Sequence, residues 1–189
     1  MSNLRGDSQA SRRRFLRAVA GVTLAMPALS LPRVGHAYSS YRNVHRLAFE
    51  HAHTGERVSL VYRMGGEYVP SALRVLNHFL RDFRTGDQCQ MDPQLLDILS
   101  LLSSLTRSKQ PFQVISAYRS PLTNAMLREQ GRGVARSSLH LEGRAIDIRL
   151  EDVPLSDLRD AALSLKGGGV GYYPGPDFVH VDTGRVRAW

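Results

Sequence analysis

The sequence predicts an α+β domain in which a small antiparallel sheet has helices packed on one face. The chain has 189 residues, of which 42% are hydrophobic, and this is enough to bury the core of a single domain. Short segments with alternating side chains lie at both ends of the region from residue 38 onward. Apolar residues at helical spacing fill its middle.

The first half of this region reads as two strands followed by two helices. Residues 44–51 and 57–63 are predicted strands, and in the second of them every other residue is apolar. A helix is expected from about Ser71, with apolar residues spaced by three or four as far as Phe83. A second helix is expected from Asp92-Pro93 to about Ser108, because Asp is a good N-cap and Pro suits the first helical position.

The second half is predicted to supply most of the sheet. Strands are expected over residues 112–118, 144–150, 170–173 and 178–182. A short helix should begin at Ser120-Pro121, and another should cover residues 157–165 and end at the glycines 167–169. Residues 131–136 read as a polar loop. The strands would be held by turns rich in Gly and Pro.

Residues 1–37 have the features of a twin-arginine signal peptide. Arg12, Arg13 and Arg14 precede a modest apolar run, and Gly35-His36-Ala37 offers small residues for cleavage. This predicts a leader at 1–37, a mature domain at 38–189, the twin-arginine export machinery as a partner, and a periplasmic location. No stable membrane anchor is expected after cleavage of the leader. The alternative is an amphipathic arginine-rich helix on the mature domain.

The charge of the chain is concentrated in this leader. The formal net charge is +8, and residues 1–37 contribute +5 of it through six arginines and one aspartate. The mature region shows no basic stripe interleaved with aromatic residues, so nucleic-acid binding is not expected. The single cysteine, Cys89, has no neighbours at metal-ligand spacing and is interpreted as an incidental thiol.

Three residues of the second half form a candidate metal site. His140 and Asp147 are seven residues apart, and His180 lies in a later predicted strand. Imidazole and carboxylate ligands suit Zn²⁺, and three such ligands leave a position open for water, as in catalytic zinc sites. From spacing alone the alternative is a buried Asp147 paired with Arg144 or Arg149, beside two ordinary histidines.

The pattern Ser138-x-His140-x-x-Gly143-x-Ala145-x-Asp147, with His180 further on, resembles the zinc D-alanyl-D-alanine carboxypeptidase and endopeptidase family (peptidase family M15). The segments 116–120, 168–174 and 178–184, together with Trp189, resemble the murein endopeptidase K branch of that family. The likeness covers essentially all of the mature chain and implies an M15/hedgehog-like peptidase fold.

The resemblance also implies roles for individual residues. Zn²⁺ would be bound by His140, Asp147 and His180. Arg119 matches the usual arginine of the family, which would grip a substrate carboxylate or steady an oxyanion; the alternative for it is a surface salt bridge. The general base would be Asp177, three residues before the last ligand, and its rival is Asp182, which could instead orient a ligand.

The function implied by this resemblance is hydrolysis of peptidoglycan. The chain would be a zinc-dependent murein endopeptidase that cleaves the peptide cross-links between stem peptides, with metal-activated water as the nucleophile. One alternative is a D-alanyl-D-alanine-type carboxypeptidase. Another is a metal-bearing module that binds the cell wall without catalysis.

Overall fold

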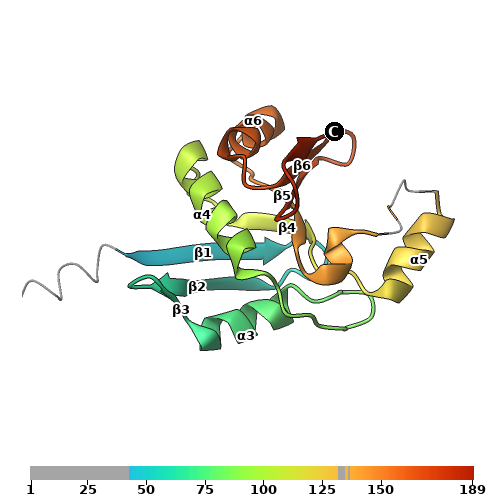
Figure 1. Cartoon of the computed structure of the whole chain (residues 1–189), viewed down its shortest axis with the longest axis horizontal. Helices are drawn as coiled ribbons and strands as arrows, with labels where there is room; N and C mark the ends of the chain where they lie inside the picture. Colours follow the sequence, from blue (N-terminus) through green and yellow to red (C-terminus); the bar gives the residue numbers. More distant parts are fainter. Residues whose placement is uncertain (1–42, 132–134, 136) are drawn as a thin grey trace, which may run out of the picture. The chain divides into compact units, whose positions relative to one another are not determined.

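One eight-stranded sheet forms the centre of the computed structural model, which describes residues 43–131, 135 and 137–189 (Figure 1). Its strand order is β3-β2-β1-β4-β5-β7-β6-β8. The strands are β1 (Val44–His51), β2 (Arg57–Met64), β3 (Glu67–Tyr68), β4 (Phe112–Ser116), β5 (Ala145–Arg149), β6 (Gly169–Tyr173), β7 (Phe178–Asp182) and β8 (Arg187–Ala188). The predicted leader lies outside the described residues.

The sheet is not the small one expected, and it is antiparallel only in part. The β1–β4 and β6–β8 pairs are parallel, whereas the other neighbouring pairs are antiparallel. The parallel β1–β4 pair joins the N-terminal hairpin to the C-terminal strands and so enlarges the sheet. Parallel neighbours need a long crossover, and here it contains the two helices that precede β4. Strand patterns in the sequence do not reveal such pairings.

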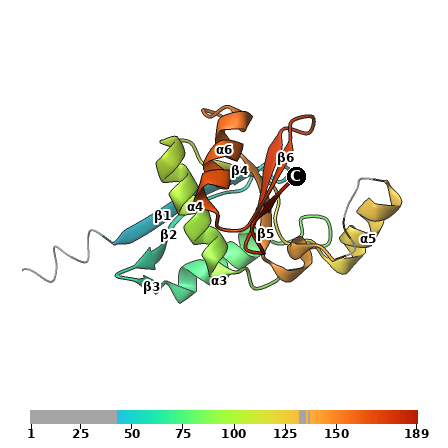
Figure 2. The same cartoon turned by 45° about the horizontal axis from the view of Figure 1, so that its top comes forward.

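Helices α3 (Pro70–Phe79), α4 (Pro93–Thr106) and α6 (Leu155–Leu165) pack on one face of the sheet (Figure 2). Their apolar side chains share one buried cluster with every second residue of the central strands, among them Ile146, Ile148, Val179 and Val181. The predicted packing of helices on one face is therefore confirmed for these three. Helix α5 (Pro121–Glu129) extends beyond the edge of the sheet instead (Figure 1).

Two elements end earlier than predicted, and both ends lie near the candidate site. Helix α3 stops at Phe79, after which Asp82 accepts hydrogen bonds from the backbone N–H groups of Arg84 and Ser120 at 2.9 and 2.8 Å. Strand β4 stops at Ser116 because the next residues bond elsewhere. The Ala117 carbonyl contacts a histidine ring, and the Tyr118 N–H donates to the Leu80 carbonyl.

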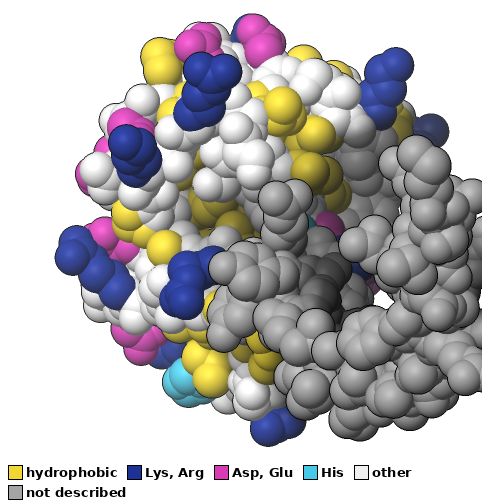
Figure 3. All heavy atoms as spheres, turned by 90° about the vertical axis from the view of Figure 1, so that its left-hand side faces the viewer, with side chains coloured by type: hydrophobic (Ala, Val, Ile, Leu, Met, Phe, Trp, Pro, Cys, Tyr) yellow, Lys and Arg dark blue, Asp and Glu magenta, His cyan; other side chains and the backbone are white. Residues whose placement is uncertain are grey.

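The surface shows charges of both signs. On the face in Figure 3, Lys and Arg side chains alternate with Asp and Glu side chains over the described part. Within the described ranges, no helix combines the length and the apolar character that crossing a bilayer requires.

Candidate metal centre

Strands β5 and β7 place a carboxylate and an imidazole side by side. Asp147 and His180 are direct partners in the antiparallel register of these strands. Side chains alternate along a strand, and the neighbours Ile146 and Ile148 point into the core under the helices. Asp147 and His180 therefore project from the opposite face, although both are buried.

A short 3-10 helix, η1 (Leu139–Glu142), brings His140 to the same place. The Ser138 hydroxyl caps this helix by accepting from the His140 backbone N–H at 3.4 Å. Gly143 ends the helix with φ +68°, and a Cβ there would lie 2.6 Å from the Gln90 carbonyl oxygen. The glycine of the motif is thus required by both its backbone conformation and the close approach of a neighbouring segment.

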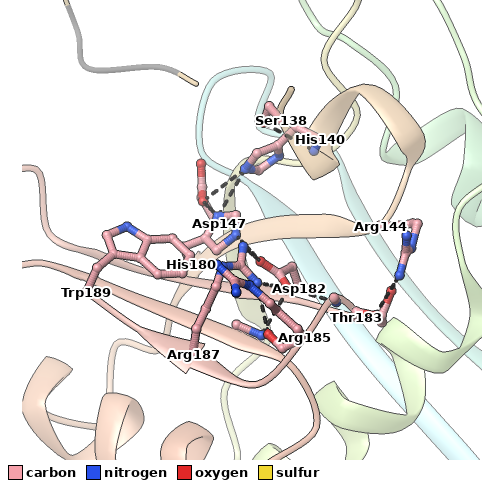
Figure 4. A network of polar contacts seen from close by, with 12 residues as sticks. Ser138, His140, Arg144, Asp147, His180, Asp182, Thr183, Arg185, Arg187 and Trp189 are labelled. Carbon is pink, nitrogen blue, oxygen red and sulfur yellow. Dashed lines mark hydrogen bonds and ion pairs between the residues drawn. The ribbon is translucent and has the colours of Figure 1, made fainter. Parts of the chain in front are cut away.

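The three predicted ligands converge, as Figure 4 shows. His140 Nε2 lies 3.2 Å from His180 Nδ1 and 3.3 Å from Asp147 Oδ1. His180 Nδ1 lies 2.9 Å from the same carboxylate oxygen. The alternative pairing of Asp147 with Arg144 or Arg149 is not formed, because these arginines contact Thr183 and Asp177 instead.

In each imidazole, one nitrogen faces the cluster and the other contacts an acceptor outside it, and this outer contact determines which nitrogen carries the proton. His140 Nδ1 lies 2.6 Å from the Ala117 carbonyl oxygen, and His180 Nε2 lies 3.0 Å from Asp182 Oδ2. Carbonyl and carboxylate oxygens are acceptors, so these two nitrogens carry the protons in the neutral rings. The lone pairs of the other two nitrogens therefore point at each other and at Asp147.

This arrangement fits a bound cation. Three acceptor atoms at 2.9–3.3 Å from one another repel unless a positive charge lies among them. Tetrahedral zinc with bonds of about 2.0–2.2 Å holds its ligand atoms roughly 3.3–3.5 Å apart, close to the spacing observed. Outer partners that fix the histidine tautomers, here Ala117 and Asp182, are a regular feature of zinc sites.

The pKa values reflect the same crowding of acceptors. Burial opposes ionisation of Asp147, but the neighbouring His140 and His180 imidazoles hold the pKa of its carboxyl well below the usual range. Burial lowers the pKa of His180, but its hydrogen bonds to Asp147 and Asp182 outweigh this and raise the pKa to about 8. Without a metal ion, a proton on His180 serves as the positive charge that the cluster needs.

The sequence of the chain matches a known protein family over most of its length. The family model described as peptidoglycan L,D-endopeptidase MepK covers residues 39–189. The chain belongs to the peptidoglycan L,D-endopeptidase MepK family.

Individual members of the MepK family are similar over nearly the whole chain. The peptidoglycan L,D-endopeptidase MepK of Escherichia coli (strain K12) is 43% identical over 183 residues, which are 97% of this chain and 100% of the relative. The relative from Shigella flexneri has the same identity and coverage. The probable peptidoglycan L,D-endopeptidase MepK of Haemophilus influenzae is 44% identical over 144 residues, 76% of this chain and 77% of its own.

A solved structure, that of the L-Ala D-Glu endopeptidase ChiX of Serratia marcescens, is a more distant match. It covers 40% of this chain and 62% of its own, with 20% sequence identity and a TM-score of 0.34. This similarity is too low to bear on the fold or the function of the chain.

The arginine expected from the MepK family resemblance reaches the site. Arg119 is buried, and its guanidinium Nη2 lies 3.7 Å from Asp147 Oδ2. Its backbone N–H donates to the His140 carbonyl at 3.1 Å, which ties the turn after β4 to η1. Its Nε is buried and has no acceptor among the described residues. Arg119 is therefore no surface salt bridge, and it keeps a donor available.

The two candidate bases lie in different surroundings. Asp182 is fully buried, and five donors contact its two oxygens: the N–H groups of Gly169 and Gly184, two nitrogens of Arg187, and His180 Nε2. These contacts hold its pKa well below the usual range although burial opposes this. Asp177 has a φ of +60° in the turn before β7, a side chain 58% exposed, and an ion pair with Arg149 at 3.0 Å.

A cavity of about 350 Å³ opens beside the three converging residues. Arg119 and Asp182 line it together with them, whereas Asp177 is not among its lining residues. Its other wall is aromatic and includes Tyr173, Phe178 and Trp189. Sequence reasoning assigned no role to these rings. In the sequence, Tyr173, Phe178 and Trp189 stood out only as parts of the segments that resemble the murein endopeptidase K branch.

Proposed function

We propose that this chain is a zinc-dependent peptidoglycan endopeptidase that hydrolyses the peptide cross-links between stem peptides. Its active domain would be residues 38–189, released from a twin-arginine leader at 1–37 and located in the periplasm. Membership of the MepK family supports the substrate. The observation that carries the chemistry is the convergence of three acceptor atoms beside an open cavity.

His140, Asp147 and His180 would hold the zinc through His140 Nε2, Asp147 Oδ1 and His180 Nδ1. When bound, the ion supplies a Lewis acid that polarises a peptide carbonyl and lowers the pKa of water to about 7. Asp182 would act by keeping the proton of His180 on Nε2, so that Nδ1 stays free as a ligand. Ala117 would do the same for His140.

Arg119 would bind the substrate. Arg119 lines the cavity, its Nη2 lies near Asp147, and its buried Nε has no acceptor among the described residues. It stays charged under all ordinary conditions, so it can receive a carboxylate or the oxygen on which negative charge develops. The hydrogen bond from its backbone N–H to the His140 carbonyl fixes its position relative to the three ligands.

For the proton transfer we propose Asp177 rather than Asp182. The oxygens of Asp182 are occupied by five donors, so it has no lone pair free to take a proton from water. Asp177 is exposed at the start of β7, and the described residues give it one ion pair, to Arg149. Arg149 and Asp147 are two residues apart on β5 and so project from the same face of the sheet. To act as the base, Asp177 would leave Arg149 and turn along this face towards Asp147.

Digestion of purified muropeptides by residues 38–189, with and without a chelator, tests this function against its alternatives. Conversion of cross-linked dimers to monomers that stops with the chelator is the expected result. Removal of terminal D-alanine alone would show a carboxypeptidase. Binding to cell-wall material without any product would show a non-catalytic module.

A further inference from the structure

One wall of the cavity is built from aromatic rings that the proposed chemistry does not use. Trp189 follows strand β8, and its indole centroid lies 5.2 Å from that of His180. The Tyr173 ring stacks on Phe178 at 4.6 Å with an interplanar angle of 23°. The indole N–H donates to the Tyr173 hydroxyl at 2.7 Å and joins the two parts of this wall. We call Trp189 and Tyr173 the indole wall.

The indole is held rigidly in this position. Backbone bonds fix its main chain to β6: the Trp189 N–H donates to the Val170 carbonyl at 3.2 Å, and the Tyr172 N–H donates to the Trp189 carbonyl at 3.0 Å. Gly171 lies underneath, where a Cβ would come within 2.8 Å of both aromatic rings. The absence of a side chain at Gly171 thus makes room for the indole wall.

A charged residue also packs against the indole. The Arg187 guanidinium carbon lies 4.7 Å from the indole centroid, and Arg187 also forms the ion pair with Asp182 at 2.6 Å. The indole is therefore linked through Arg187 and Asp182 to the orientation of His180 (Figure 4).

Despite these contacts Trp189 is 50% exposed. A large aromatic side chain that is rigid and half-exposed beside a reaction centre is prepared for binding, because little conformational entropy remains to be lost. The indole lines the cavity, and its apolar ring carbons suit contact with a saturated hydrocarbon chain.

We propose that the indole wall binds an aliphatic side chain of the substrate. This side chain belongs to the diamino acid, such as diaminopimelate, through which two stem peptides are cross-linked. This rests on the proposed function, since that function supplies the stem peptide as substrate. The diamino acid is the stem residue that carries a run of methylene groups, and it lies next to the bond that is cleaved. The centroid of the Trp189 ring lies only 5.2 Å from that of His180, which would bind the zinc. The indole would therefore contact a group adjacent to the cleaved bond.

The glycan is the other component of peptidoglycan that could stack on an indole. Two stem residues separate it from the diamino acid, and each extended residue spans about 3.3–3.6 Å. A sugar would therefore lie roughly 7 Å or more beyond the cross-link, too far for a surface in contact with His180. The structure favours the peptide side chain.

Tryptophan fluorescence reports directly on this wall, because Trp189 is the only tryptophan of the chain. The zinc-free protein is titrated with the stem tripeptide that ends in diaminopimelate. A saturable change in emission is expected with this peptide and no change with the matched peptide that ends in alanine. An equal response to the alanine peptide, or a response to the peptide-free disaccharide, would overturn the proposal.

Kinetics on cross-linked muropeptide dimers provide the second readout. W189A should raise KM about tenfold with kcat within about twofold, since the lost contact is the same in the ground and transition states. W189F should stay within about threefold of the wild type. V186A is the control, because Val186 is an exposed apolar residue of the same segment outside the cavity lining.

The outcomes separate the two proposals. Failure of the wild type to cleave dimers would contradict the proposed function and leave the fluorescence titration to decide on the wall. Cleavage by W189A with wild-type KM would contradict the wall alone. Zinc content and melting temperature are measured for each variant. If W189A does not fold, the fluorescence titration of the wild-type protein still decides.

Discussion

Hydrogen-bond donors surround the buried carboxylate of Asp182, and they bear on the role of this residue. Its oxygens accept from His180, from Arg187 and from two backbone N–H groups, and it is fully buried. Sequence reasoning left open whether it is a base or a partner that orients a ligand. The number of donors around it favours the second role, and no periodicity in the sequence could have shown those donors.

D182N should weaken zinc binding about 10–100-fold, because an amide at this position no longer fixes the proton of His180 on Nε2. Competition with a zinc-binding dye measures the affinity. The matched variant D177N should bind zinc as the wild type does and lose turnover instead. If D182N binds zinc normally and only its turnover falls, Asp182 is the base and the assignment is reversed.

A second prediction at the scale of single residues concerns Arg119. R119A should lower kcat/KM by about 10²–10³-fold, since a preorganised donor for developing negative charge is lost. R119K should recover only part of this, because a lysine lacks the planar fork. Zinc content should not change in either variant, and R57A, at an arginine of β2 whose side chain is 73% exposed, is the control. Near wild-type activity of R119A would exclude a direct role for this arginine.

At the scale of elements, the sequence predicted most helices and strands but not what stops them. Asp92-Pro93 begins α4 as expected, with the Asp92 side chain accepting from the Gln94 N–H. Helix α3 and strand β4 end early because Asp82 and Ala117 bond to distant segments. Such long-range contacts leave no local signature, so the ends of these two elements and the parallel strand pairs could not be predicted.

Asp82 anchors the turn that carries Arg119. It is buried and accepts from the N–H groups of Ser120 and Arg84. Burial raises the pKa of this carboxyl, but hydrogen bonds from Thr123, Ser120 and Arg84 outweigh it, so the folded-state pKa lies below the usual value. The stabilisation by Asp82 is therefore complete above the unfolded-state pKa of about 3.9 and is lost as the pH falls through the folded-state pKa.

D82N should reduce the free energy of unfolding by about 2–3 kcal/mol at neutral pH, the scale of hydrogen bonds to a charged group. Denaturant titrations of wild type and variant across the acid range measure the difference. It should shrink below about pH 4, where the carboxyl takes up a proton first in the unfolded chain and, at lower pH, in the folded chain as well. A difference that stays constant down to the acid limit would mean that the charge of Asp82 is not what holds the turn.

At the scale of the whole molecule, the two faces of the sheet have different roles: one packs the core and the other carries the candidate site. One face carries the buried cluster under α3, α4 and α6, and the other presents the three converging acceptors and their cavity. The metal motif identified these residues from the sequence because its spacing matches one known family. The aromatic wall and the donors around Asp182 are assembled from β6, β7 and β8, and their proximity depends on strand pairings that the sequence does not reveal.

Zinc should stabilise the folded chain as a whole, because the three ligands come together only in the folded state. A free zinc concentration of 1,000 times Kd would add about 4.1 kcal/mol to the free energy of unfolding. Thermal unfolding with and without a chelator should therefore show a clear fall in Tm. H140A should be insensitive to the chelator, and a chelator effect of wild-type size in H140A would place the metal elsewhere.

The most direct test of the central claim is a zinc titration of the stripped protein, followed by the conversion of cross-linked muropeptide dimers to monomers. The stripped protein should be inactive, activity should rise linearly to a break at one zinc per chain, and D147N should show no such rise. Conversion that persists in the stripped protein, or that returns with zinc in D147N, would contradict a catalytic zinc site at His140, Asp147 and His180.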